Sequence, residues 1–270
     1  MVEREGISED TLLGGKVRLL QPMAGHRAGT DAVLAAALAG PEGGEGIVDL
    51  GSASGAIGLI LAASLPDARV VLAERDSSLA ALARENVALN GFTDRAGVAE
   101  IDAFDPAARW RETWPEALLP LGQAGLVVTN PPFFDDPRAR PSPDPGRRAA
   151  HMMAGGGLRE WIAAAARLLR PGGRLVMIHR ADALAACLGA LPPAFGTIIL
   201  RPVLPRADAD ASRIVLSARK GGRGPLAIRP PLVLHGPDGR FTPEAAALHA
   251  NPVEAGPSGD ATARRRRPRP

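Results

Sequence analysis

The part of this chain that most constrains its fold is residues 47–75, where a short apolar run, a glycine-rich turn, a helical segment and a second apolar run follow one another. The first run, Ile-Val-Asp-Leu, is bounded by glycine-rich sequence, which is typical of a strand covered on both faces of a parallel sheet. Gly51 and Gly55 allow a tight turn, and the free N–H groups that start the next helix face it. The stretch therefore predicts a strand, a turn, a helix and a strand around a ligand crevice.

The second apolar run ends in Glu74, 23 residues after Gly51. The carboxyl ends of neighbouring parallel strands meet at one edge of the sheet, and an acid there can accept hydrogen bonds from both hydroxyls of a ribose. A solvated surface acid is the plainer explanation of Glu74. Its register with the glycine turn favours an adenosine site, which both nicotinamide cofactors and S-adenosylmethionine would fit.

Residues 127–133 form another apolar run, which ends in Asn130, Pro131, Pro132 and Phe133. This Asn-Pro-Pro-Phe tetrapeptide resembles the signature of methyltransferases that modify planar amino groups. The chain is similar to class I S-adenosylmethionine-dependent methyltransferases, because the motif follows, in the expected order, Asp49, Gly51, Gly55, Glu74 and Asp102. A plain Pro-Pro turn after a strand is the alternative.

The chemistry of the tetrapeptide supports the resemblance. An exocyclic amine is a poor nucleophile because its lone pair is delocalised into the ring. The Asn130 side-chain oxygen and the Pro131 carbonyl can accept hydrogen bonds from the two N–H groups of this amine, which favours a pyramidal nitrogen. Pro131 and Pro132 fix φ and supply no competing N–H, and Phe133 offers a face on which a base can stack. These four residues are the predicted catalytic group.

The resemblance also implies a set of cofactor contacts. Gly51 and Gly55 would leave room for the methionine half of S-adenosylmethionine, and Asp49 would organise their turn. Asp102 would accept the adenine amino group, although a loop cap is its plainer explanation. Relatives usually carry another glycine between the first two, where this chain has Ala53. Alanine is tolerated there if its φ stays negative.

A narrower resemblance begins at Gly29-Thr30-Asp31. This segment is similar to bacterial tRNA adenine-N6 methyltransferases that act beside the anticodon of the valine tRNA, in which it helps to cover the cofactor. The implied product is N6-methyladenosine in tRNA. Three alternatives stay open: a release-factor glutamine-N5 methyltransferase, a ribosomal RNA guanine-N2 methyltransferase and a cofactor-binding RNA chaperone without turnover.

Arginines concentrate in a proline-rich segment, residues 135–148, and in the last residues of the chain. Solvated surface charge is the plain explanation of both clusters. In a protein that holds folded RNA they would neutralise phosphates. The candidate RNA-binding residues are Arg138, Arg140, Arg147, Arg148 and, beside the target base, His151.

The fold class follows from strands that alternate with helices after residue 46. We expect an α/β, Rossmann-like domain with a mostly parallel, doubly wound sheet and an antiparallel hairpin, residues 197–203 and 213–218, at one sheet edge. The divisions expected are an N-terminal extension over 1–45, the methyltransferase domain over 46–220, an appendage over 221–250 and a disordered basic tail over 251–270. Residues 1–11 are expected to be poorly ordered, with Thr30 as a helix N-cap and residues 104–124 as a surface connection.

Composition sets the remaining bounds. Hydrophobic residues make up 46% of the 270 residues, and no apolar run approaches the roughly 18 that a membrane span needs. The single cysteine, Cys187, lies in an Ala/Leu helical pattern typical of a buried structural thiol. We therefore expect a cytoplasmic protein with no membrane segment and no metal; the sequence leaves its oligomeric state open.

Overall fold

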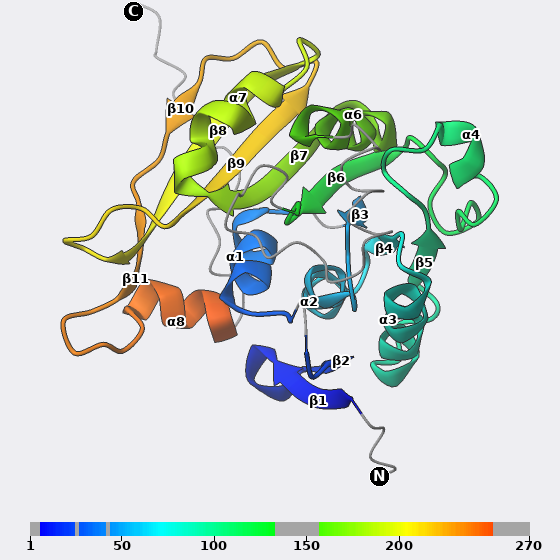
Figure 1. The fold of residues 1–270 in the computed structure, drawn as a ribbon, viewed down its shortest axis with the longest axis horizontal. Coiled ribbons are helices and arrows are strands. Elements are labelled where there is room, and N and C mark those ends of the chain that lie inside the picture. Colours follow the sequence, from blue (N-terminus) through cyan, green and yellow to red (C-terminus); the bar gives the residue numbers. More distant parts are fainter. Residues whose placement is uncertain (1–5, 25–26, 42–43, 133–156, 251–270) are drawn as a thin grey trace, which may run out of the picture.

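A nine-stranded sheet runs through the centre of the computed structural model, which describes residues 6–24, 27–41, 44–132 and 157–250. Figure 1 shows the sheet with helices on both faces, which confirms the α/β doubly wound class. In sheet order the strands are β10 (Ala227–Ile228), β8 (Phe195–Arg206), β9 (Arg213–Lys220), β7 (Leu169–Arg180), β6 (Ala124–Thr129), β3 (Gly46–Leu50), β4 (Arg69–Glu74) and β5 (Ala96–Glu100); β11 (Leu232–His235) pairs with β8 as well.

The expected hairpin is present, but it is not the sheet edge. β9 runs antiparallel to both β7 and β8, whereas β10 and β11 pair in parallel with the outer side of β8. Residues 227–235 form two short strands, β10 and β11, and not one continuous strand, because Pro230 and Pro231 cannot donate the N–H bonds that a continuous ladder needs. Because β7 is parallel to β6, β8 is parallel to β7 through the antiparallel β9, and β11 is parallel to β8, these four strands all end at one edge of the sheet.

Two hydrophobic cores occupy the two faces of the sheet. The first lies under α1 (Thr30–Leu38), α2 (Ala56–Ser64), α3 (Ser77–Leu89) and α8 (Pro243–Ala250). The second lies under α4 (Ala107–Trp110), α6 (Leu158–Leu168) and α7 (Leu184–Ala190). Short 3-10 turns, η1 (Leu13–Gly15) and η2 (Ala181–Ala183), complete the secondary structure. None of the helices in the described ranges combines the length and apolar character required to cross a membrane.

The N-terminal residues depart from expectation. Residues 7–11 are not disordered: β1 (Ile7–Leu12) pairs antiparallel with β2 (Val17–Pro22), and Glu9 pairs with Arg18 at 2.7 Å. The side chains of Asn86, in the last turn of α3, and of Asn90, its C-cap, exchange hydrogen bonds of 2.7–2.8 Å with the backbone of β2. These amides therefore take the place of a neighbouring strand and hold the hairpin against α3.

The connection over residues 104–124 also differs from a surface loop. Trp110 and Trp114 are buried, and their indole N–H groups donate to the carbonyls of Asp102 and Leu119 at 2.8 and 2.7 Å. The guanidinium of Arg167 lies 4.3 Å above the Trp110 ring. The segment thus extends the second core instead of lying over it.

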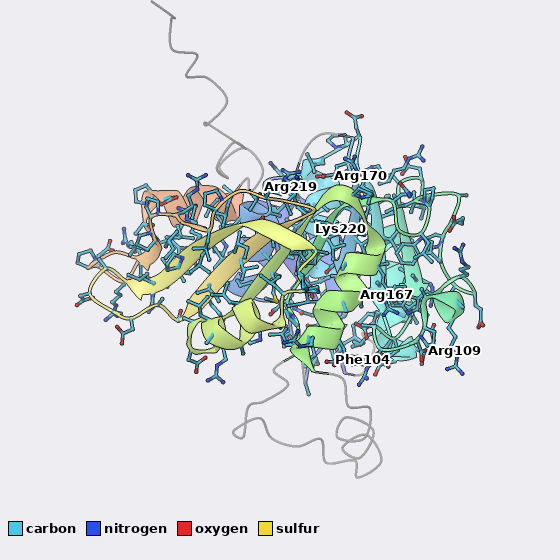
Figure 2. The ribbon with its side chains drawn as sticks, turned by 90° about the horizontal axis from the view of Figure 1, so that it is seen from above. Phe104, Arg109, Arg167, Arg170, Arg219 and Lys220 are labelled. Atoms are coloured by element: carbon cyan, nitrogen blue, oxygen red, sulfur yellow. The ribbon has the colours of Figure 1, made fainter. Side chains whose placement is uncertain are left out.

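Cationic side chains satisfy the end of α6. Lys220 donates from Nζ to the carbonyls of Ala166 and Leu169, and Arg219 donates to that of Gly172. Figure 2 shows both labelled at this end of the helix, with Phe104 at the opposite end. The last carbonyls of a helix lack partners within it and carry partial negative charge, so these contacts fix where α6 ends and β7 begins.

Candidate functional site

The glycine turn after β3 has the backbone that its sequence requires. Gly51 and Gly55 have φ of 75° and 96°, in the region that favours glycine. The N–H groups of Gly51 and Ser52 both donate to the Ala73 carbonyl, at 2.8 and 3.1 Å. A Cβ at Gly51 would meet the Trp161 ring at 2.8 Å, so conformation and close packing both select glycine there.

Ala53 does not meet the condition of a negative φ: its φ is 48°. A left-handed alanine costs roughly 1–2 kcal/mol relative to an unstrained residue. Its N–H donates to Oε2 of Glu74 at 2.8 Å, which helps to hold the conformation. The usual glycine is therefore replaced in sequence while its backbone geometry is kept.

Glu74 lies almost fully buried at the end of β4 and faces this turn. Its Oε1 accepts from the N–H groups of Arg75 and Asp76, both at 2.9 Å, and its Oε2 accepts from Ala53. A carboxylate offers about four acceptor sites, so one remains, on Oε2. Glu74 can accept one ligand hydroxyl there without giving up a backbone bond.

Asp102 follows β5 at the same edge of the sheet, and its neighbours Ile101 and Ala103 line a cavity there of about 540 Å³. Its Oδ1 accepts from the Phe104 N–H at 3.0 Å, and Oδ2 is 3.4 Å from Arg75 Nη1. The carboxyl therefore caps the loop after β5, which is the alternative to an adenine contact. The adenine contact stays a prediction.

Asn130 and Pro131 follow β6 at the same edge of the sheet. Thr129 Oγ1 donates to the Leu50 carbonyl at 2.7 Å and accepts from Trp161 Nε1 at 3.0 Å. This chain of bonds fixes the ends of β3 and β6 relative to α6, and with them the backbone that enters Asn130. Pro131 is buried and Pro132 is exposed. Phe133, Arg138, Arg140, Arg147, Arg148 and His151 lie outside the described residues.

Two cavities meet at these elements. The larger, about 540 Å³, extends from Glu74, Leu79 and Phe104 to Asn130. The smaller, about 330 Å³, lies between the glycine turn and the start of α1, including Gly29 and Thr30. The residues that line both are Asp31, Gly51, Ala53, Asn130 and Arg213. The site is one elongated depression, with Asn130 where its two halves join.

Arg213, the first residue of β9, ties the start of α1 to the edge of the sheet that carries the site. Its Nε lies 3.0 Å from Asp31 Oδ2 across 182 residues of sequence. Gly29, not Thr30, is the N-cap of α1, so Thr30 is its first helical residue. Sequence reasoning missed Arg213, because an arginine that begins a strand carries no motif or spacing signal.

Aromatic residues were missed as well. Trp161 and Phe104 line the larger cavity and contact each other edge to face, with ring centroids 6.1 Å apart. Trp161 belongs to the amphipathic pattern of α6, which by itself indicates only a core residue. In the part of the chain that is described, no cluster of three His, Cys, Asp or Glu residues could hold a metal.

Asp49 is completely buried beneath the glycine turn. Its Oδ2 accepts from the Gly58 N–H at 2.9 Å, while its Oδ1 has no hydrogen-bond partner. Burial raises the pKa of Asp49 to about 7; the Gly58 bond opposes this rise and the charge of Glu74 adds to it. A Cβ at Gly58 would meet Leu72 Cδ2 at 2.0 Å, so only glycine lets α2 approach this carboxyl.

This carboxyl makes the stability of the protein depend on pH. Between about pH 4 and 7 the folded state holds a proton that the unfolded state has lost, so the free energy of unfolding falls as pH rises. Asp49→Asn should remove that slope. Relative to the variant, the wild type should lose about 3 kcal/mol between about pH 4 and 7, as measured by urea unfolding.

The control for this comparison is Asp67→Asn, a change of an exposed acid. Burial lowers the pKa values of His179 and His249, which adds an opposing slope that all three proteins share. Equal pH dependence in the wild type and the Asp49 variant would contradict the prediction.

Comparison with known proteins gives a consistent result. A family model described as a methyltransferase small domain matches residues 28–198. The chain is similar to the tRNA1(Val) (adenine(37)-N6)-methyltransferase of Aeromonas hydrophila, at 30% identity over 220 residues, which cover 80% of this chain and 85% of that protein. The enzyme of the same name from Porphyromonas gingivalis is 36% identical over 162 residues, 58% of this chain. That match spans 60% of the relative's own length.

Two further similarities bear on the chemistry. A release factor glutamine methyltransferase of Xylella fastidiosa is 32% identical over 144 residues, which cover 50% of this chain and 47% of that protein. A crystal structure from Agrobacterium tumefaciens, described as a predicted O-methyltransferase, superposes with a TM-score of 0.68 at 31% identity, over 83% of this chain and 96% of that one.

Proposed function

The chain belongs to the methyltransferase small domain family, and from this we propose that it uses S-adenosylmethionine to methylate the exocyclic N6 of an adenine beside the anticodon of a tRNA, in the cytoplasm. The observation that carries the proposal is the place of Asn130, at the junction of the two cavities. The side chain proposed to accept from the amine, Asn130, is therefore also part of the wall of the proposed adenosine site.

The residues present fit this cofactor. The larger cavity pairs apolar walls at Leu79 and Phe104 with the free acceptor site of Glu74, which suits an adenosine. The smaller cavity offers Gly29, Thr30 and the glycine-turn backbone to the methionine half. When bound, S-adenosylmethionine would supply an electrophilic methyl group. Asp49 lies buried beneath the glycine turn and holds the Gly58 N–H. Asp102 caps the loop that carries Phe104 into the wall of the larger cavity.

Asn130 and Pro131 would act on the substrate amine. Their oxygens accept its N–H groups, and these bonds strengthen as the nitrogen becomes pyramidal. The bonds from Trp161 to Thr129 and from Thr129 to Leu50 hold the backbone that leads to Asn130, so the acceptors are fixed before the substrate arrives. The protein needs to contribute only position and hydrogen-bond acceptors.

The RNA itself would be held by charge and stacking. We assign phosphate contacts to Arg138, Arg140, Arg147 and Arg148, a base contact to His151 and a stacking face to Phe133, on the sequence alone. The similarity to tRNA methyltransferases supports tRNA as the substrate.

The test is transfer of tritiated methyl groups to bulk tRNA, followed by nucleoside analysis. We expect N6-methyladenosine, and in calorimetry we expect binding of S-adenosylhomocysteine but not of NAD. Binding of NAD without S-adenosylhomocysteine would reject the methyltransferase assignment.

A release-factor glutamine is the second candidate acceptor, because a side-chain amide presents the same planar N–H₂ group to Asn130. The similarity to the Xylella fastidiosa enzyme favours it over the remaining alternatives. Release factor and ribosomal RNA therefore belong in the assay as competing substrates. Methylglutamine or N2-methylguanosine as the main product would reject the tRNA assignment and keep the cofactor.

A further inference from the structure

A third cavity, of about 420 Å³, lies away from the cofactor site. Its walls come from two turns and are lined by Pro205, Arg206, Ala209, His235 and Gly239. The first turn is closed by the Ala209 N–H, which donates to the Arg206 carbonyl at 3.2 Å; the second is closed by bonds of 2.9 and 3.0 Å that Gly236 and Gly239 make. Both walls are therefore fixed by backbone hydrogen bonds.

A stack of three rings backs this cavity. His235 stacks on Phe241 with ring centroids 5.0 Å apart, and Phe241 stacks on His249 at 4.5 Å. The Nδ1 of His235 lies 3.2 Å from the Pro205 carbonyl, which fixes the ring orientation. Because Phe241 covers only one face of the His235 ring, and the ring also lines the cavity, a flat ligand can extend the stack.

One cationic side chain, that of Arg206, lines this cavity. Arg206 is exposed, and across the described part of the chain it has no ion pair with a carboxylate. Asp208 and Asp210 lie on the same turn and Asp238 lies on the second turn; all three are exposed, and none of them lines the cavity. A flat ring beside a free guanidinium is the combination that recognises a nucleotide, through its base and its phosphate.

The cavity and Asn130 open at the same edge of the sheet. β8 and β11 run parallel to each other, and β8 runs parallel to β6 because β9 is antiparallel to both β8 and β7. Arg206 and His235 end β8 and β11, as Asn130 follows the end of β6 (Figure 1). Three to four strand spacings separate them across the sheet, roughly 15–20 Å, and the register places Arg206 five residues beyond the level of Asn130, roughly a further 16 Å along the strands. One RNA molecule can reach both sites.

We propose that this cavity is a second RNA subsite, in which a base of single-stranded RNA near the target nucleotide stacks on His235 while its phosphate contacts Arg206. The assignment rests on the proposed tRNA substrate. It makes His235 and Arg206 determinants of RNA affinity that take no part in methyl transfer.

The test compares tRNA binding by four variants of the full chain. His235→Ala should raise the Kd for tRNA about 5- to 100-fold, whereas His235→Phe, which keeps a stacking face, should stay within about threefold of the wild type. Arg206→Ala should lower the slope of log affinity against log salt by about 0.7. Arg223→Ala is the matched control: this exposed arginine lies at the opposite end of β8, beside Gly224, whose carbonyl accepts from Thr197.

Affinity for S-adenosylhomocysteine and kcat at saturating tRNA should be unchanged in all four variants. The subsite is rejected if His235→Ala and Arg206→Ala behave like Arg223→Ala, or if His235→Phe loses as much affinity as His235→Ala. Thermal unfolding checks the fold, and the exposed Arg206 keeps the test decisive if His235→Ala does not fold. Failure of the proposed function differs from both outcomes, because the wild type itself would then transfer no methyl group to tRNA.

Discussion

Asn130→Ala is expected to lower kcat for tRNA methylation by about 100- to 1000-fold, the loss typical of removing one fixed hydrogen-bonding group from a transition state. The affinity for S-adenosylhomocysteine should stay within about threefold of the wild type. Asn130 borders both cavities, but the acceptor that we assign to the cofactor's ribose is Glu74. The side-chain oxygen of Asn130 accepts a hydrogen bond from the amine. This hydrogen bond strengthens only as the nitrogen becomes pyramidal.

The two constants separate this role from a structural one. A contact made only in the transition state lowers kcat and kcat/KM together, whereas collapse of the site would weaken S-adenosylhomocysteine as well. Single-turnover methyl transfer and calorimetry on the same preparation measure both. A kcat within tenfold of the wild type would show that Asn130 is not the acceptor.

Glu74→Ala is expected to weaken S-adenosylhomocysteine binding by about 100-fold or more and to destabilise the fold. Hydrogen bonds to a charged group contribute about 1.5–3 kcal/mol each, and this carboxylate accepts from Ala53, Arg75 and Asp76. Without it, three N–H groups lose their acceptor and the left-handed Ala53 loses its restraint. The loss of affinity thus combines a missing ligand contact with a disordered glycine turn.

Two variants separate those contributions. Glu74→Gln keeps one oxygen acceptor but places an N–H₂ group against one set of donors. Its affinity for S-adenosylhomocysteine and its stability should therefore lie between those of the wild type and those of Glu74→Ala. Glu100→Ala is the matched control, because Glu100 lies directly opposite Glu74 in the β4–β5 register and pairs with Arg84 away from the cavity. Calorimetry and thermal unfolding give the two readouts. Cofactor affinity in Glu74→Ala equal to that in Glu100→Ala would refute the ribose assignment.

The parts of the site that could be predicted from sequence are those set by strand register. Glu74 and Asn130 each follow an apolar run, and parallel strands bring their carboxyl ends together whatever the loops do. Arg213 and Asp31 are 182 residues apart, and the Asn86 bond to β2 spans 66. No local pattern encodes such contacts. The positive φ of Ala53 could not be predicted from alanine's own preference, because the Glu74 acceptor that helps to hold it lies 21 residues away.

Trp161 gives the protein an optical signal of its own. Of its three tryptophans, Trp110 and Trp114 are enclosed in the second core, and only Trp161 lines the cofactor cavity. Indole emission responds to the polarity and the electronic character of whatever touches the ring. A ligand that fills the larger cavity therefore changes the fluorescence of one known residue, and occupancy can be followed in real time without a label.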